Sequence, residues 1–132
     1  MTRTWTVRID APTTVTRTGA RKTLWLNAND RPHWSQRARI TKAWRNAAQF
    51  AARRAAIPPL DRAHVTATIH KTRGGRYDPA NLYPCIKAAI DGALVDTNVL
   101  IDDDHEHLTG PDMRAGTVDP VPHIILTIKE LK

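Results

Sequence analysis

The order of hydrophobic periodicities along the chain is the feature that most restricts its fold. Two segments, 36–56 and 85–95, repeat apolar residues at intervals of three and four, as amphipathic helices do. Four short segments alternate apolar and polar residues and are predicted to be half-buried strands. They are TWTVRI (4–9), TLWLNA (23–28), HVTATIHK (64–71) and HIILTIKEL (123–131). Strands and helices mixed along a short chain predict an α/β protein of the α+β kind, with a mixed sheet and two main helices.

Local signals refine this expectation. Ser35 is the expected N-cap of the first helix, and the prolines of IPPLD (57–61) are expected to end it. The first two strands are expected to pair as a hairpin across 13–22. Segment 110–122, rich in glycine and proline, is expected to be a connection. A further strand is expected to begin at the acidic segment after the second helix. The basic outer face of the first helix consists of Arg39, Lys42, Arg45, Arg53 and Arg54.

Length and composition fit one domain over residues 1–132. The chain has 132 residues, 41% of them hydrophobic and 25% charged, enough for one hydrophobic core. The N-terminus lacks an apolar leader, and no run of about 18 apolar residues occurs, so a cytoplasmic protein without a membrane segment is expected. Cys85 is the one cysteine, and its apolar neighbours predict a core position.

Charge is divided between the two parts of the chain. Residues 1–76 contain 16 Lys and Arg but only three acidic residues, whereas residues 77–132 contain four Lys and Arg and ten acidic residues. A basic surface attracts polyanions through counterion release. An acidic cluster would repel a polyanion unless a cation neutralised it. This pattern fits a metal-dependent nuclease, although charges spread over solvated faces would give the same totals.

The segment VLIDDDHEHLTG (99–110) carries the strongest chemical signal. Its three adjacent aspartates, Asp102, Asp103 and Asp104, repel one another by roughly 1 kcal/mol per pair in water at ~4 Å. Asp78, in the loop before the second helix, is either an ordinary N-cap or a second acidic point. A helix that connects neighbouring strands could bring both points to one sheet edge. Carboxylate clusters suit Mg²⁺ and Mn²⁺, which promote phosphodiester hydrolysis.

The geometry of a strand limits how many of these aspartates could bind one metal, and the spacing of the histidines bears on which metal it is. In an extended strand Asp102 and Asp104 would point one way, and Asp103 and His105 the other, so not every aspartate could reach one metal. Zinc is disfavoured, because His105 and His107 lack the HExxH or CxxC spacing of zinc sites.

The stretch RYDPANLYPCIKAAIDGALVDTNVLIDDDHEHL (76–108) resembles the core of the RusA-type Holliday junction resolvases, particularly those of actinobacterial phages and prophages. In that family an Asp-x-Asp-Asn loop opens a helix bearing Lys and Asp four residues apart, and an Asp-Asp pair follows. Asp78 matches the first loop aspartate, Asn81 the asparagine, and Lys87 with Asp91 the helical pair. Asp102 and Asp103 match the later pair. The resemblance extends over nearly the whole chain.

Two departures from the family pattern concern the loop. Ala80 replaces its second aspartate, and three additional residues separate Asn81 from Lys87. Asp104 or Asp91 could supply the missing carboxylate, or the site could hold fewer ions. The phage branch commonly has this Asp-Pro-Ala-Asn form.

The resemblance implies a homodimer that binds a four-way DNA junction and nicks two opposed strands with Mg²⁺ or Mn²⁺, without a small-molecule cofactor. Asp78 and Asp103 would bind metal, with Asp102 and Asp104 as alternates. Lys87 would stabilise phosphate charge, and Asp91 would orient Lys87 or form only a helix ion pair. The residues expected to contact DNA are Arg73, Arg76, Asn27, Asn29, Arg31 and His33.

Other interpretations stay open. Lys87 could be a surface lysine, and Trp34 is expected to be a core anchor rather than a stacking platform. A protein that lost catalysis at Ala80 would bind branched DNA without cutting it. A nuclease for other branched DNA or for RNA would carry the same residues.

Overall fold

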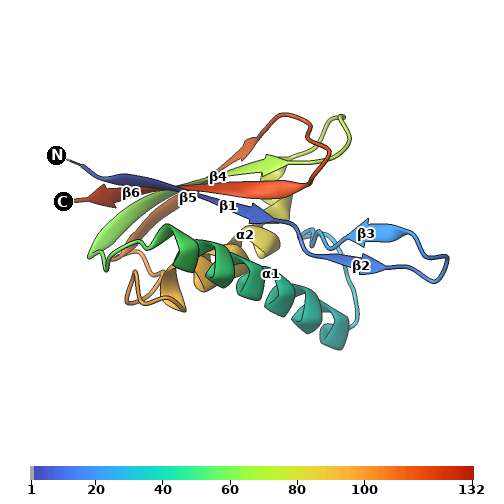
Figure 1. Cartoon of the computed structure of the whole chain (residues 1–132), viewed down its shortest axis with the longest axis horizontal. Helices are drawn as coiled ribbons and strands as arrows, with labels where there is room; N and C mark the ends of the chain where they lie inside the picture. Colours follow the sequence, from blue (N-terminus) through green and yellow to red (C-terminus); the bar gives the residue numbers. More distant parts are fainter. Residues whose placement is uncertain (1) are drawn as a thin grey trace.

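The computed structural model describes residues 2–132, and its main element is a four-stranded sheet with the order β1-β6-β4-β5 (Figure 1). β1 (Thr4–Asp10) and β4 (Arg62–His70) flank β6 (His123–Leu131), and both are antiparallel to it. β5 (Leu108–Ala115) lies at the edge, parallel to β4. The predicted mixed sheet is therefore confirmed, as are three of the four strands predicted from alternating apolar and polar residues.

Two helices lie on one face of this sheet (Figure 1). α1 (Trp34–Ala55) contacts β1, and α2 (Tyr83–Ile90) contacts α1. α2 follows a 3₁₀ turn, η1 (Pro79–Leu82), and continues into one π-helical turn, η2 (Asp91–Val95). Both predicted helices are confirmed, as is the α+β class. No helix within residues 2–132 has the length and apolar character needed to cross a membrane.

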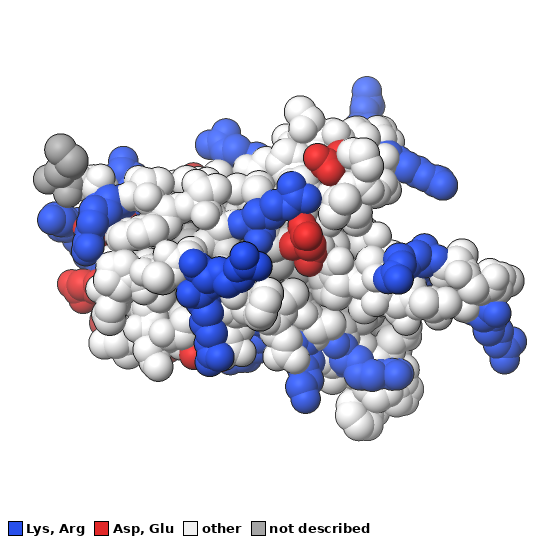
Figure 2. Space-filling view, in the orientation of Figure 1, with Lys and Arg blue, Asp and Glu red and all other residues white. Residues whose placement is uncertain are grey.

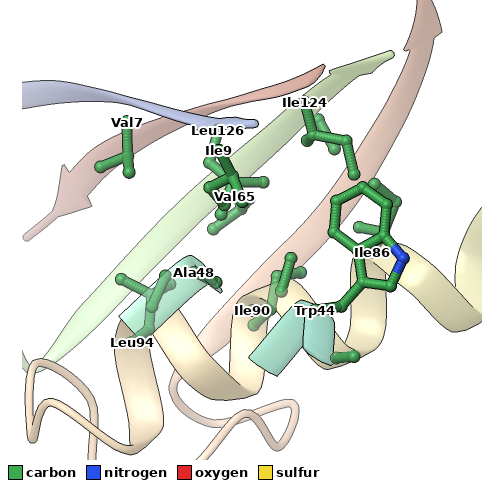
Figure 3. Close-up of a cluster of buried hydrophobic side chains, with 14 of the residues drawn as sticks. Val7, Ile9, Trp44, Ala48, Val65, Ile86, Ile90, Leu94, Ile124 and Leu126 are labelled. Carbon is green, nitrogen blue, oxygen red and sulfur yellow. The ribbon is translucent and has the colours of Figure 1, made fainter. Parts of the chain in front are cut away.

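One core joins the helices to the sheet (Figure 3). Val65, Ala67 and Ile69 alternate along β4 and are fully buried, as the sequence pattern predicts. Cys85 is also buried, which confirms its predicted core position. Trp44 of α1 is fully buried, and its indole Nε1–H donates to the Leu24 carbonyl at 2.6 Å. Each large apolar side chain buried here contributes about 1.5–3 kcal/mol.

The start of α1 differs from the prediction. The N-cap is His33 rather than Ser35, and the Ser35 N–H donates to the His33 ring at 3.2 Å. Ser35 lies inside the first turn, where its hydroxyl is 2.8 Å from the same ring nitrogen. The His33 ring nitrogen thus caps the N-terminus of the helix, a role that was expected of the Ser35 hydroxyl. The helix ends at Ala55, and Ala56 has left-handed φ and ψ.

The predicted hairpin of segments 4–9 and 23–28 is wrong. β1 pairs with β6, and a separate hairpin is formed by β2 (Thr13–Val15) and β3 (Arg21–Thr23). The backbone beyond β3 bonds to the helices instead of a strand. The Leu26 N–H donates to the Cys85 Sγ at 2.9 Å, and the Ala28 N–H donates to the Asn81 carbonyl at 2.6 Å.

The acidic segment and the strand after it also differ from expectation. Residues 103–107 form bends and turns, and the strand begins at Leu108. β5 extends through Gly110 and Pro111, which were expected to lie in a connection. An edge strand tolerates proline, because one side of its backbone needs no partner. Gly110 has φ +99, and a Cβ there would meet the Val65 carbonyl oxygen at 2.6 Å.

Candidate active site

The predicted metal-binding and catalytic residues all lie in the connection between β4 and β5. Asp78 follows the carboxyl end of β4, whereas the acidic segment precedes the amino end of β5, where the Ala63 N–H donates to the His107 carbonyl at 2.9 Å. Because β4 and β5 are parallel, these points lie at opposite ends of the strand pair. The sheet edge therefore does not bring them together, and the carboxylates that do meet approach along α2.

Lys87, Asp91 and Asp103 form the centre of the candidate site, here called the Lys87 cluster. The Lys87 Nζ donates to Asp91 Oδ1 at 2.9 Å and to Asp91 Oδ2 at 3.1 Å, one helical turn away. It also donates to the Asp103 carboxylate, 16 residues further along the chain. The side chains of Asp91 and Asp103 are 20% and 18% exposed, so both are partly shielded from water.

The electrostatics of the Lys87 cluster follow from this geometry. The hydrogen bond from Lys87 holds the pKa of Asp103 below its ordinary value. Burial raises the pKa of Asp91, Asp103 adds to the increase, and together they outweigh the lowering by Lys87. Burial acts to lower the pKa of Lys87, but its hydrogen bonds to Asp103 and Asp91 and the charges of these two carboxylates together raise it. Two carboxylates thus share one ammonium.

The neighbouring aspartates are held by the local backbone. Asp102 Oδ1 accepts the Asp103 N–H at 2.8 Å, which fixes the start of the turn. Asp104 Oδ1 accepts the N–H groups of Glu106 at 3.0 Å and His107 at 3.2 Å, and lies 2.6 Å from His107 Nδ1. The hydrogen bond with Asp104 raises the pKa of His107, and the same bond lowers that of Asp104. Asp104 therefore closes the turn that leads into β5.

Asp78 occupies a different position. It is the N-cap of η1, and its Oδ1 accepts the Ala80 N–H at 3.0 Å. Among residues 2–132, no hydrogen bond or ion pair joins Asp78 to the Lys87 cluster, and no three His, Cys, Asp or Glu side chains form a group that could hold a metal ion. Ala80 is exposed, and Asn81 is partly buried beside it.

Arg73 and Arg76 lie in the loop between β4 and η1. With Lys71, Trp25 and Tyr77, they line an open pocket of about 270 Å³, and none of the described residues in its wall carries a carboxylate. Gly75 has φ +131, which only glycine adopts readily. Lys71 Nζ lies 4.0 Å from the centre of the Tyr77 ring. The loop therefore presents three cations around one hollow.

The polar loop before α1 packs beside the Asp78 loop through the Ala28–Asn81 hydrogen bond. Its predicted contact residues also stabilise the loop itself. Asn27 accepts the Asn29 N–H at 2.8 Å, and Arg31 Nη1 donates to the Ala28 carbonyl at 3.1 Å. His33 caps α1, as described above.

Trp34 is exposed over 75% of its surface, so the expectation that it is a core anchor is wrong. Its ring centre lies 5.5 Å from that of His33. Trp34 lines an open groove of about 490 Å³ on the outer side of α1. Arg37, Lys42 and Arg45 contribute its basic side chains.

Arg45 was expected only as part of a basic helix face, but it connects that face to the candidate site. Its Nε and Nη2 donate to the two carboxylate oxygens of Asp96, both at 2.6 Å. The hydrogen bond to Asp96 raises the pKa of Arg45, and the charges of Asp91 and Asp103 contribute. The partners are 51 residues apart, and no local pattern marks such a pair.

The chain was also compared with known proteins. No family model matches it, and no curated protein matches it.

Proposed function

We propose that the protein is a RusA-like, metal-dependent DNA endonuclease that resolves four-way junctions by paired nicking in DNA recombination or repair. It would act in the cytoplasm as a homodimer. The observation that carries the proposal is the Lys87 cluster, in which two carboxylates from separate elements meet one lysine beside a basic helix. These are the positions that the family resemblance assigns to the site.

The Lys87 cluster suits chemistry on a phosphodiester. The cluster has two partly shielded carboxylates and only one ammonium, so its net charge is negative and it can still bind a cation. Lys87 would stabilise the charge that develops on the phosphate as the bond breaks, because a fixed cation needs no rearrangement at that moment. Asp91 is a positioning residue, since it holds Lys87 from one helical turn away.

The donor set is compatible with a magnesium or manganese ion. Mg²⁺ usually keeps several waters and is bound by one or two carboxylates together with substrate phosphates. Asp103 and its neighbour Asp102 would supply such carboxylates. The resemblance names Asp78 together with Asp103 as ligands, with Asp102 and Asp104 as alternates. Asp78 caps η1 apart from the Lys87 cluster, so its loop would have to move toward Asp103 to share one ion. When bound, the ion would polarise the phosphate and lower the pKa of an attacking water.

The basic surfaces supply the binding that a nuclease needs. Arg37, Lys42 and Arg45 line the groove on α1, and the charges of Asp91 and Asp103 contribute to the raised pKa of Arg45. Figure 2 shows Lys and Arg side chains spread over the visible face, with few acidic ones among them. Arg73 and Arg76 would contact phosphates from their own loop.

A homodimer follows from the symmetry of the proposed reaction. A four-way junction is cut at two equivalent strands, and a two-fold dimer offers two equivalent sites.

The test is a cleavage assay on a labelled four-way junction and on a linear duplex of the same arm sequence. The purified protein is incubated with each substrate in Mg²⁺, Mn²⁺ or EDTA. The proposal expects paired nicks in the junction only with a divalent ion, and little cutting of the duplex. Equal cutting of both substrates would contradict junction selectivity, and cutting in EDTA would contradict the metal requirement.

A second candidate is a branched-DNA-binding protein without catalysis. It is favoured by the absence of a three-ligand metal group among residues 2–132 and by Ala80 at the position of a family aspartate. Such a protein would bind the junction more tightly than the duplex in EDTA and would leave both substrates intact in Mg²⁺ and Mn²⁺. The same assay therefore separates the two candidates.

A further inference from the structure

The hairpin formed by β2 and β3, residues 13–23, projects from the body of the molecule near the beginning of α1 (Figure 1). The three residues of β2 are all exposed, as are residues 17–22. An isolated two-stranded hairpin is at best marginally stable in water. An exposed ribbon of this kind gains little from folding alone, which points to a role in binding.

The hairpin is basic and has no acidic residue. It carries Arg17, Arg21 and Lys22, and the sequence from 11 to 29 contains neither Asp nor Glu. In Figure 2 the projecting end shows blue side chains and no red ones. A polyanion would therefore meet no charge repulsion along this ribbon.

The pairing register distributes these charges around the ribbon. Thr14 is opposite Lys22, and Val15 is opposite Arg21, so Lys22 and Arg21 point to opposite faces. Arg17 lies in the turn between the strands. A flat acidic surface could contact only one of these faces at a time. Two phosphate backbones, one on each side, would contact both.

We propose that hairpin 13–23 binds in the major groove of a DNA duplex arm. The major groove is about 12 Å wide and admits a two-stranded β-ribbon, whereas the minor groove is only about 6 Å wide. Arg21 and Lys22 contact the phosphates on either side, and Arg17 reaches in from the tip.

The rest of the ribbon suits this environment. Val15, 61% exposed, can contact a thymine methyl group. Arg21 Nη1 donates to Thr13 Oγ1 at 2.8 Å, which limits the freedom of the arginine before binding. On the other face, Thr14 and Arg39 of α1 line one pocket, so a groove-bound ribbon would place α1 close to the same arm.

This inference rests on the proposed function for its choice of substrate, but its test needs no cleavage. Arg17, Arg21 and Lys22 are replaced together by alanine. The matched control replaces Arg62, Arg114 and Lys129 by alanine, which removes the same charges. Each control residue is next in sequence to a residue that faces the core: Arg62 to Ala63, Arg114 to Met113 and Lys129 to Ile128. Because side chains alternate along a strand, the three control residues project from the face of the sheet opposite the helices.

Binding of junction and linear duplex is measured by fluorescence anisotropy in EDTA over a series of KCl concentrations. The hairpin variant is expected to lose about tenfold or more in affinity for both substrates. Its log-log salt slope should fall by about 2 to 3, or about 0.9 per phosphate contact. The control variant should lose much less. Equal losses in the two variants would overturn the proposal, as would wild-type binding by the hairpin variant.

Competition separates the two grooves. Methyl green, a major-groove ligand, should displace the wild-type protein more readily than distamycin, a minor-groove ligand, and this preference should weaken in the hairpin variant. The reverse order in the wild type would overturn the major-groove assignment. Failure of the proposed function would be distinct, because a protein that binds through the hairpin but never cuts would retain these results.

Discussion

At the scale of single residues, the proposed role of Lys87 predicts different effects of its replacement on the cleavage rate and on DNA affinity. Replacing it by alanine should reduce the single-turnover cleavage rate at saturating protein by about 100-fold, because a preorganised charge near the phosphate is lost. Junction affinity in EDTA should stay within a few-fold, since Lys87 is already paired with Asp91 and Asp103. Lys129→Ala, on β6, is the control. A loss of affinity as large as the loss of rate would contradict the catalytic role.

Ala80 tests whether the departure from the family pattern matters. Its side chain is exposed, and its N–H is bound to Asp78. Ala80→Asp should lower the Mg²⁺ concentration needed for half-maximal cleavage several-fold, because a third carboxylate adds a hard oxygen ligand. Ala80→Asn, similar in shape but neutral, is the control. An unchanged Mg²⁺ titration would indicate that Asp91 or Asp104 supplies the carboxylate instead.

At the scale of elements, the close contact of α1 with η2 depends on Gly92. A Cβ at this position would meet the Arg45 carbonyl oxygen at 2.1 Å, so an alanine must push the two helices apart. Gly92→Ala should destabilise the protein by about 3 kcal/mol. Gly74→Ala, whose Cβ would meet only Val118 Cγ2 at 3.8 Å, should be nearly neutral. Urea denaturation compares them, and similar midpoints would contradict this account of the contact.

The Arg45–Asp96 ion pair fixes the same contact electrostatically and predicts a pH dependence. The hydrogen bond from Arg45 lowers the pKa of Asp96 in the folded state, so the pair stabilises above the unfolded pKa of about 3.9. This stability is lost as the pH falls through the folded-state pKa. Asp96→Asn should therefore cost about 1 kcal/mol at neutral pH, a modest figure because both side chains are partly solvated.

The difference between the wild type and Asp96→Asn should shrink in strong acid. Urea denaturation at a series of pH values measures it, with Asp10→Asn, in an exposed pair with Arg8, as the control. A constant difference from neutral pH to strong acid would show that the asparagine acts through something other than lost charge.

The helices and strands also show which parts of the fold could be predicted from the sequence. β6 was predicted with its observed bounds, and both helices were predicted within a few residues, because their periodicity is regular and one face is buried. β5 was not, since its side chains are mostly exposed and it contains Gly110 and Pro111. β3 is only three residues long, and nothing in 21–28 indicates that the backbone after it bonds to Trp44 and Cys85.

The candidate site was predictable in part for a similar reason. Lys87 and Asp91 are one helical turn apart, so their contact follows from local geometry. The contact of Lys87 with Asp103 was not predicted: the resemblance assigned both residues to the site without pairing them, and their contact depends on how the turn 101–107 folds back toward α2. Arg45 and Asp96 meet through tertiary packing, and Asp78 lies apart as a cap.

At the scale of the whole molecule, the uneven charge predicts a division of labour. Replacing Arg73 and Arg76 by alanine should weaken junction binding and lower the log-log salt slope by about 0.9 for each phosphate that the protein no longer neutralises. The single-turnover rate at saturating protein should fall much less, because phosphate contacts mainly position the substrate. Salt titrations and single-turnover kinetics on the same preparations measure both. Rate and affinity falling in parallel would leave only a general basic surface.

If the proposed function is correct, carboxylates in the β4–β5 connection perform metal-dependent cleavage of a branched DNA. The most direct measurement is the single-turnover rate of junction cleavage in Mg²⁺ by Asp103→Asn and Asp78→Asn, with affinity measured in EDTA. Asp112→Asn, an exposed aspartate of β5, is the control. Asp103→Asn and Asp78→Asn are each expected to abolish cleavage while affinity is unchanged or improved, because each removes a proposed ligand and a repulsive charge. Cleavage at the wild-type rate by both variants would contradict it.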